Sequence, residues 1–126
     1  MPILTQPPSM GDVLKYELNP NFTRETITLL AGTAYPVGAV LGRTTASGKY
    51  KLATSGGTDG AQTAAAVLLY AVDATAADAS GLVVMRGPAI ISKAALVFDA
   101  TVDDAAKTTT KHGQLTALGI VPRDTA

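Results

Sequence analysis

The longest nearly uncharged stretch of the chain runs from Asp59 to Asp73. No residue between these two aspartates carries a charge, and from Ala64 to Val72 the only polar group is the Tyr70 hydroxyl. Such a run predicts a strand that is buried on both faces. The run is too short to cross a membrane, because a spanning helix needs roughly 20 apolar residues. We therefore expect this strand to lie at the centre of the fold.

Shorter patterns of the β type lie on both sides of this run. They are rich in apolar and β-branched residues and end at glycine or proline, which is typical of short strands. A hairpin turn is predicted at residues 46–48, between two such segments. The predicted strands are residues 23–30, 39–42, 82–86, 89–91 and 120–122. This pattern predicts a mainly β domain.

The C-terminal part changes in character and predicts a small helical element. Residues 103–107 place two aspartates before a lysine, the order that a helix prefers, and Thr101 could cap its start. A second helix is predicted over residues 110–118, with Gly119 at its end. Three consecutive threonines at 108–110 argue against one continuous helix, because β-branched residues lose rotamer freedom there. The fold class is therefore α+β, mainly β with a small α element.

The N-terminus predicts an extended arm. Its first ten residues contain three prolines, which oppose a helix, and the six residues that follow Asp12 alternate in the manner of a strand. A turn at residues 19–21 then closes this segment. We expect residues 1–22 to form the arm and residues 23–126 a compact β-rich domain.

The alternation of the arm places apolar and charged side chains on opposite faces. Leu14, Tyr16 and Leu18 share one face, while Lys15 and Glu17 lie on the other. Two interpretations remain open at this point. The segment is either an edge strand of the domain's own sheet, or a strand that pairs with another chain.

Composition narrows the classes of function. Ten basic and ten acidic residues cancel, and no Lys/Arg cluster is long enough to follow a phosphate backbone, so direct nucleic-acid binding is not expected. The chain has no cysteine, which excludes disulfides and thiolate metal sites. A neutral, alanine-rich surface favours association with other subunits. The N-terminus lacks the pattern of a signal peptide, so we expect synthesis in the cytoplasm.

Few residues are candidates for chemistry. His112 is the only histidine, and its polar surroundings predict a surface side chain. Glu17 and Glu25 are the only glutamates, and Asp103 with Asp104 lacks the spaced oxygen ligands of a calcium loop. The aspartates at predicted strand ends are typical of turn caps: Asp12, Asp59, Asp73 and Asp99. The glycine-bearing stretches at 48–49 and 56–60 lack the phosphate-loop motif. We expect no enzymatic activity and no catalytic, cofactor-binding or metal-binding residues.

Several segments, in order along the chain, carry a resemblance to a known family: residues 11–17, 23–32, 38–42, 48–50, 59–60 leading into 65–68, and 119–121. Together they resemble the bacteriophage head decoration proteins, the family of the lambda-type capsid-stabilising protein D. The resemblance extends from about residue 11 to residue 123. One departure is the arm, which is rich in small polar residues in the lambda type and carries a patterned strand here.

The resemblance implies a homotrimer that binds at three-fold positions of the expanded phage head and stabilises the capsid against the pressure of packaged DNA. It implies the major capsid protein as partner and the outer surface of the virion as location, with no role for a membrane. We interpret the patterned strand as a capsid-binding arm, with Val13, Leu14, Lys15, Tyr16, Glu17 and Leu18 as contact residues. The alternatives are a small trimeric adhesion or tail module, or a small cytosolic β-barrel enzyme that uses aspartate and His112.

Overall fold

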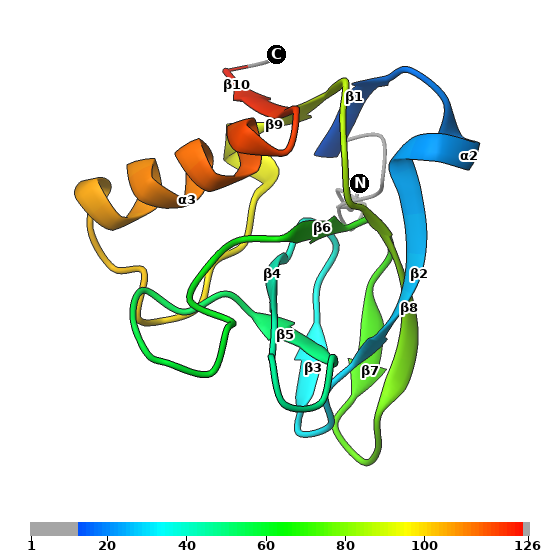
Figure 1. The fold of residues 1–126 in the computed structure, drawn as a ribbon, viewed down its shortest axis with the longest axis vertical. Coiled ribbons are helices and arrows are strands. Elements are labelled where there is room, and N and C mark those ends of the chain that lie inside the picture. Colours follow the sequence, from blue (N-terminus) through cyan, green and yellow to red (C-terminus); the bar gives the residue numbers. More distant parts are fainter. Residues whose placement is uncertain (1–12, 125–126) are drawn as a thin grey trace, which may run out of the picture.

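Ten short strands and one long helix make up the computed structural model, which describes residues 13–124 (Figure 1). The expected class, mainly β with a small α element, is confirmed. The strands are β1 (Leu14–Glu17), β2 (Arg24–Leu29), β3 (Thr33–Tyr35), β4 (Val40–Arg43), β5 (Tyr50–Leu52), β6 (Ala66–Leu68), β7 (Val72–Ala74), β8 (Ala79–Val84), β9 (Ala89–Ser92) and β10 (Ile120–Arg123). The helices are α2 (Pro20–Thr23), the 3₁₀ turn η1 (Lys93–Ala95) and α3 (Ala105–Ala117).

Five strands close into a small barrel in the order β2-β5-β4-β6-β8. The longest pairing joins β2 and β8 antiparallel, from Arg24 opposite Val84 to Leu29 opposite Ala79. The buried strand predicted from the sequence is confirmed as β6, which lies between β4 and β8 and is buried at all three residues. It is shorter than predicted because the chain turns at Tyr70, whose side chain is 51% exposed.

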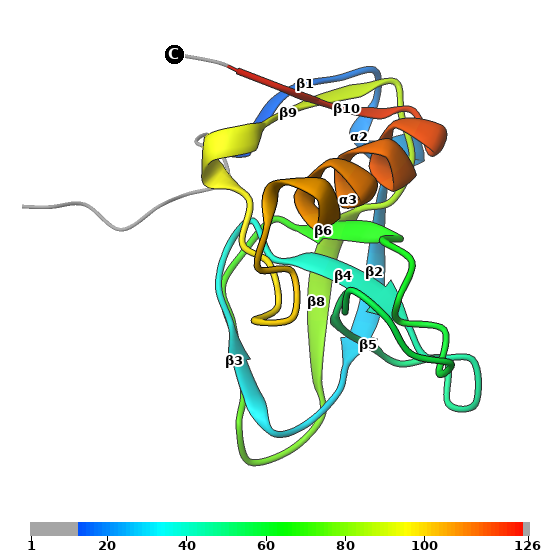
Figure 2. The same ribbon diagram turned by 90° about the vertical axis from the view of Figure 1, so that its left-hand side faces the viewer.

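A second, three-stranded sheet lies at one end of the barrel (Figures 1 and 2). Its central strand β9 runs antiparallel to β1 and parallel to β10. A further pair, β3 and β7, forms a two-stranded ribbon at the opposite end. The molecule thus has a sheet end and a ribbon end with the barrel between them.

Helix α3 is continuous, so the prediction of two separate helical pieces is wrong. The hydroxyl groups of Thr108 and Thr110 donate hydrogen bonds to the carbonyl oxygens four residues earlier, which satisfies them within the helix. The cap is Asp104, whose carboxylate accepts from the Lys107 backbone N–H at 2.8 Å, and not Thr101. Gly119 follows the helix with φ +83°, as its predicted role at the end of the helix requires.

The hydrophobic core has two parts. One lies inside the barrel and includes the fully buried leucines Leu29, Leu41 and Leu68. The other lies between the barrel, α3 and the inner face of the three-stranded sheet, where Ile91 and Leu115 are fully buried. The helix and the sheet are therefore joined to the barrel by apolar packing.

Two glycines allow the chain to cross itself where the three-stranded sheet begins. A Cβ on Gly87 would overlap the backbone of Gly119. The Ala89 N–H donates to the Gly119 carbonyl at 3.1 Å, and the Gly87 N–H donates to the Leu118 carbonyl at 2.9 Å. The starts of β9 and β10 are thus held against each other by backbone contact.

One lysine is buried at the junction of α3 and the barrel. Lys111 is 1% exposed, and its ammonium donates to the Gln62 carbonyl and, at 3.3 Å, to the Gln114 side-chain oxygen. Burial lowers the pKa of Lys111, because desolvation disfavours the charged form. The Gln114 side-chain oxygen also accepts from the Ala64 backbone N–H. Lys111 and Gln114 of α3 therefore hold the loop before β6 against the helix.

Candidate interaction surface

The strand predicted for the arm exists, but it pairs with β9 of the domain's own sheet. Leu14 lies opposite Ile91, and Tyr16 lies opposite Ile90. Of the two interpretations left open, the pairing seen in the structure is that of an edge strand. Strand β1 is therefore part of the domain's sheet, whereas residues 18–22, which the sequence also placed in the arm, are exposed. Residues 1–12, including Asp12, lie outside the described part of the chain.

A register shift between Leu14 and Tyr16 changes the faces that the alternation predicted. Val13 is buried and Leu14 is half-buried against the core, but Tyr16 and Leu18 are 50% and 59% exposed. Lys15 is exposed, and Glu17 is turned toward the domain. The expectation that Leu14, Tyr16 and Leu18 share one face is wrong. The irregularity at Lys15 places the Tyr16 side chain on the opposite face of the sheet from the Leu14 side chain.

Glu17 joins β1 to the start of β2 through a compact set of hydrogen bonds. Its carboxylate accepts from the Arg24 guanidinium at 2.5 and 3.0 Å and from the Thr23 hydroxyl at 2.7 Å. Burial alone would raise the pKa of Glu17, but the hydrogen bonds from Arg24 and Thr23 and the charge of Arg24 outweigh it and lower the pKa. Glu17 is thus a structural residue that holds β1 in place.

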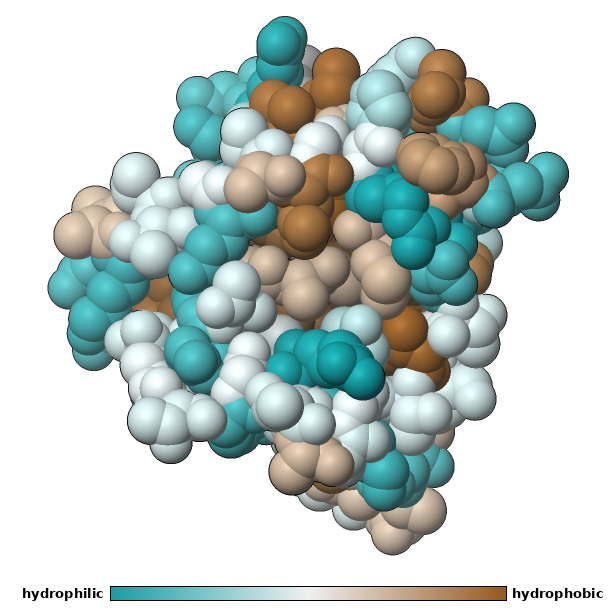
Figure 3. Space-filling model, in the orientation of Figure 1, coloured by the Kyte–Doolittle hydropathy of each residue, from teal (hydrophilic) through white to brown (hydrophobic). Residues whose placement is uncertain are grey.

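Helix α2 continues this surface beyond β1. Asn19 caps the helix by accepting from the Asn21 backbone N–H at 2.9 Å. The Phe22 side chain is 52% exposed, and the Arg86 guanidinium lies 5.6 Å from the centre of its ring. Glu25 pairs with the same guanidinium at 3.0 Å. Figure 3 shows apolar residues among polar ones at this end of the visible face.

The outer face of the three-stranded sheet carries an apolar row. Tyr16 lies opposite Ile90, and Ile90 lies opposite Val121. Residues directly opposite one another in a sheet point to the same face. The next residues along β9 and β10 in either direction are buried, so this row points outward. Sequence periodicity does not reveal this row, because its three residues come from strands far apart in the chain.

Both outer strands of this sheet have a neighbour on one side only within residues 13–124. Strand β10 contains Pro122, which has no N–H to donate to a further strand. On β1 every residue from Leu14 to Glu17 keeps its N–H. Strand β1 is therefore the better template for an added strand.

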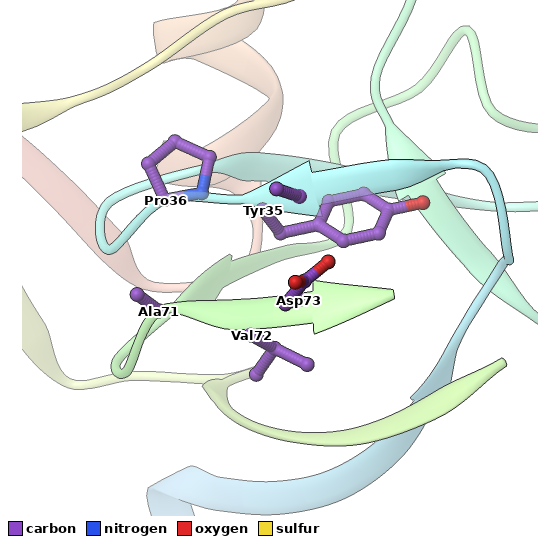
Figure 4. Close-up of a pocket in the computed structure, with 6 residues that line it drawn as sticks. Tyr35, Pro36, Ala71, Val72 and Asp73 are labelled. Carbon is purple, nitrogen blue, oxygen red and sulfur yellow. The ribbon is translucent and has the colours of Figure 1, made fainter. Parts of the chain in front are cut away.

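A shallow hollow of about 370 Å³ lies at the ribbon end, between β3 and β7 (Figure 4). Its lining is mostly apolar and includes Pro36 and Val72. The Tyr35 hydroxyl donates to the Leu30 carbonyl at 2.8 Å, and burial, followed by the nearby Asp78 charge, raises its pKa. The Asp73 carboxylate accepts from the Thr75 backbone and hydroxyl. The polar groups of the hollow are thus engaged in holding local turns.

His112 is half-buried, so the prediction of a surface histidine is wrong. Its Nε2 is buried with no hydrogen-bond partner in the described structure, and its ring lies 5.9 Å from the Phe98 ring. Burial, followed by the nearby Lys93 charge, lowers the pKa of His112, while Asp124 acts in the opposite direction. The His112 ring thus packs between α3 and the segment that contains Phe98.

The aspartates at strand ends cap turns, as the sequence predicts. Asp59 accepts from the Ala61 N–H at 3.0 Å, and Asp99 accepts from the Thr101 N–H at the same distance. Within residues 13–124 no three His, Cys, Asp or Glu side chains are grouped so that they could hold a metal ion. No helix in the same range is long and apolar enough to span a membrane.

Within residues 13–124 the structure is a closed barrel with an attached three-stranded sheet and exposed aromatic side chains. Residues 3–120 match the family model of the bacteriophage lambda head decoration protein D. The chain therefore belongs to this head decoration family, which is structural and not enzymatic. No curated protein matches the chain. Family membership places the chain at the phage capsid, as the resemblance in the sequence implied.

Proposed function

We propose that the protein binds as a homotrimer at three-fold positions of the expanded phage head and stabilises the shell against the pressure of packaged DNA. The partner is the major capsid protein, on the outer surface of the virion. The observation that carries this proposal is the outer position of β1 in the sheet formed by residues 13–124, beside exposed Tyr16 and Leu18, in a chain of the decoration family. A cyclic trimer buries one head-to-tail patch three times and closes without leaving that patch exposed.

In this proposal β1 receives a strand of the capsid protein along its open edge. Main-chain hydrogen bonds then supply binding energy, and the side chains of Tyr16 and Leu18 supply apolar contact. Val13 to Leu18 act as the contact segment through their backbone, although Val13 and Glu17 face the domain. A single edge contact is weak, but three on one trimer can raise avidity by about 10² to 10⁴ without a new contact.

Two tyrosines provide a matched test. Tyr16 lies on β1 and is 50% exposed, while Tyr70 lies beyond β6 and is 51% exposed. Both changes to alanine remove a similar exposed side chain, so their effects on folding should be alike. We expect Tyr16→Ala to weaken binding to undecorated expanded shells by about tenfold or more, since central aromatic contacts dominate interfaces. Tyr70→Ala should bind as the wild type does.

Co-sedimentation with purified shells measures the binding, and light scattering measures the trimer. Equal binding by the Tyr16 and Tyr70 variants would remove β1 from the attachment surface. A stable monomer at micromolar concentration would contradict the trimer. A deletion used to test the arm should stop at residue 12, because removal of buried Val13 and of Glu17 damages the domain itself.

A further inference from the structure

One peptide bond of the chain joins the two residue types that most readily rearrange their backbone. Asp59 is the only aspartate in the sequence that is followed by glycine. The backbone nitrogen of such a glycine can attack the aspartate carboxyl carbon, because no Cβ shields that nitrogen. The bond between Asp59 and Gly60 lies in the loop from β5 to β6, and the Asp59 side chain is exposed. Water therefore has access to this carboxyl group.

The rearrangement has two steps, and one water molecule leaves in the first and returns in the second. A bond forms between the Gly60 nitrogen and the Asp59 carboxyl carbon, and the carboxyl OH leaves as water with the amide proton. The product of this step is a cyclic succinimide. Water then attacks the main-chain carbonyl carbon of Asp59 and breaks its bond to the Gly60 nitrogen. The result is isoaspartate, in which the backbone runs through the former side chain and is one methylene group longer.

The local turn brings the two reacting groups close together. The Asp59 carboxylate accepts from the Ala61 backbone N–H at 3.0 Å, and this hydrogen bond folds the side chain over the intervening Gly60 peptide. Gly60 has φ +99°, which side chains other than that of glycine rarely allow. The turn thus requires glycine at the position where glycine also makes the backbone nitrogen accessible.

Two further contacts oppose the reaction. The Lys51 ammonium pairs with the second carboxylate oxygen of Asp59 at 2.6 Å. This contact, followed by the Ala61 hydrogen bond, lowers the pKa of Asp59, so the carboxyl group stays ionised and is a poor target for a nucleophile. The Gly60 N–H donates to the Gln62 side-chain oxygen at 2.8 Å, which fixes the orientation of the attacking peptide. One contact therefore restrains the carboxyl group and the other restrains the nitrogen.

The segment that the reaction would lengthen is attached to the barrel on both sides of Gly60. The Asp59 carbonyl accepts from the Thr45 N–H at 2.7 Å, and the Ala61 carbonyl accepts from the Thr54 N–H at 3.1 Å. Ala61 is fully buried, and a Cβ on Gly42 of β4 would overlap its backbone. An additional backbone carbon before Ala61 must break some of these contacts. Isoaspartate at residue 59 should therefore destabilise the barrel.

We infer that the bond between Asp59 and Gly60 is a site of isoaspartate formation, and that Lys51 and Gln62 slow the reaction in the folded protein. The modification then accumulates mainly in chains that unfold or lose these contacts. The inference does not rest on the proposed function, because the proposed attachment surface is the three-stranded sheet and this site is a loop of the barrel.

The test compares two lysine variants during prolonged incubation at mildly acidic pH. Lys51→Ala removes the ion pair with Asp59. Lys49→Ala is the matched control, because it removes a similar ion pair with Asp78, which is followed by alanine. Thermal melting first establishes that each variant is folded, and wild type unfolded in denaturant gives the unprotected rate. Peptide mapping by mass spectrometry and enzymatic methylation of isoaspartate measure the product at each aspartate.

A third variant tests the contact with the attacking nitrogen. Gln62→Ala removes the acceptor of the Gly60 N–H but keeps the Gln62 backbone carbonyl, to which Lys111 donates. The loop therefore keeps this attachment to α3. Isoaspartate at residue 59 should form faster in this variant than in the wild type.

We expect Lys51→Ala to form isoaspartate at residue 59 about threefold or more faster than the wild type, since the protonated fraction of a carboxyl group rises about tenfold for each unit of pKa. The unfolded wild type should be faster still. Lys49→Ala should follow the wild type at residue 59 and form no isoaspartate at Asp78. Aged protein that contains isoaspartate should melt at a lower temperature than fresh protein.

Three outcomes would overturn the inference. The first is an unfolded chain that forms no isoaspartate at residue 59, or forms it no faster than the folded protein. The second is wild-type rates in both Lys51→Ala and Gln62→Ala. The third is an equal acceleration by Lys49→Ala and Lys51→Ala, which would show a general loosening of the barrel. If only one of Lys51→Ala and Gln62→Ala is faster, the inference holds for that contact and is overturned for the other.

Discussion

The barrel and the three-stranded sheet solve the problem of strand edges in opposite ways. In the barrel every strand has a neighbour on both sides, and the leucines inside it are fully buried. In the sheet each outer strand has a neighbour on one side only among the described residues, and an apolar row faces outward. Closure removes edges that invite pairing, whereas an open edge is a template for it. Stability and attachment are therefore located in different parts of the molecule, which makes them separable by mutation.

The largest expected effect is in the barrel. Leu68→Ala removes a fully buried side chain from β6 and should lower the free energy of unfolding by about 2 to 5 kcal/mol, through lost apolar contact and a cavity. Chemical denaturation measures this loss. The surviving folded protein should still bind shells, because β6 does not reach the outer sheet face.

Leu118→Ala is the control for this change, because it removes the same atoms from a side chain that is 38% exposed. Its effect should be well under half of that at Leu68, since less apolar area returns to water. Equal losses for the two leucines would show that the barrel does not hold most of the stability.

An intermediate effect is expected where β1 joins the barrel. Glu17→Gln breaks the ion pair with Arg24 and should lower the free energy of unfolding by about 1 to 3 kcal/mol, because the partners are largely shielded from water. Glu25→Gln is matched, since Glu25 also pairs with an arginine but is more exposed. Its cost should be at most about 1 kcal/mol. A larger loss at Glu25 than at Glu17 would contradict the ranking.

The same pair predicts an acid dependence. Because the folded-state pKa of Glu17 is lowered from its usual 4.5, the stability from its ionised form is complete above pH 4.5. That stability is lost as the pH falls below 4.5 toward the folded-state pKa. Melting temperatures of the wild type and of Glu17→Gln should therefore converge as the solution is acidified through this range.

The smallest expected effect concerns the helix that supports the sheet. The pKa of His112 is lowered in the fold, so below its usual 6.5 the unfolded chain takes up the proton more readily. The free energy of unfolding should therefore fall slightly as the pH drops through about 6.5. His112→Phe should flatten this slope, because it keeps a ring beside Phe98 and removes the titrating group. Parallel slopes would exclude His112 as the cause.

Much of the strand content could be predicted because its cause is local. The apolar run before Tyr70 and the glycines around Ala39 to Gly42 mark buried strands whatever their partners are. Barrel closure could not be predicted, because β2 pairs with β8 about fifty residues later in the chain. Which strands meet depends on packing over the whole domain, and no local pattern carries that information.

The errors have equally specific causes. The threonines of α3 are compatible with a helix because their hydroxyls bond within it, which propensity alone does not include. The faces of β1 changed because one irregular residue shifts the register, and a sequence pattern assumes a regular strand. His112 was predicted to be exposed because its neighbours in the sequence are polar, although the ring of Phe98, fourteen residues earlier, lies against it in space.

The crossing of Gly87 and Gly119 has a consequence for how the family can diverge. Each glycine leaves room for the backbone of the other, so a side chain at Gly87 would force β10 away from β9. At Gly119 the constraint is chiefly the φ of +83°, since a Cβ there would lie 3.1 Å from the Gly87 Cα and need only a small shift. Homologues that keep this sheet should therefore retain glycine at both positions together, and those that lose one should also differ in how β10 returns to the sheet.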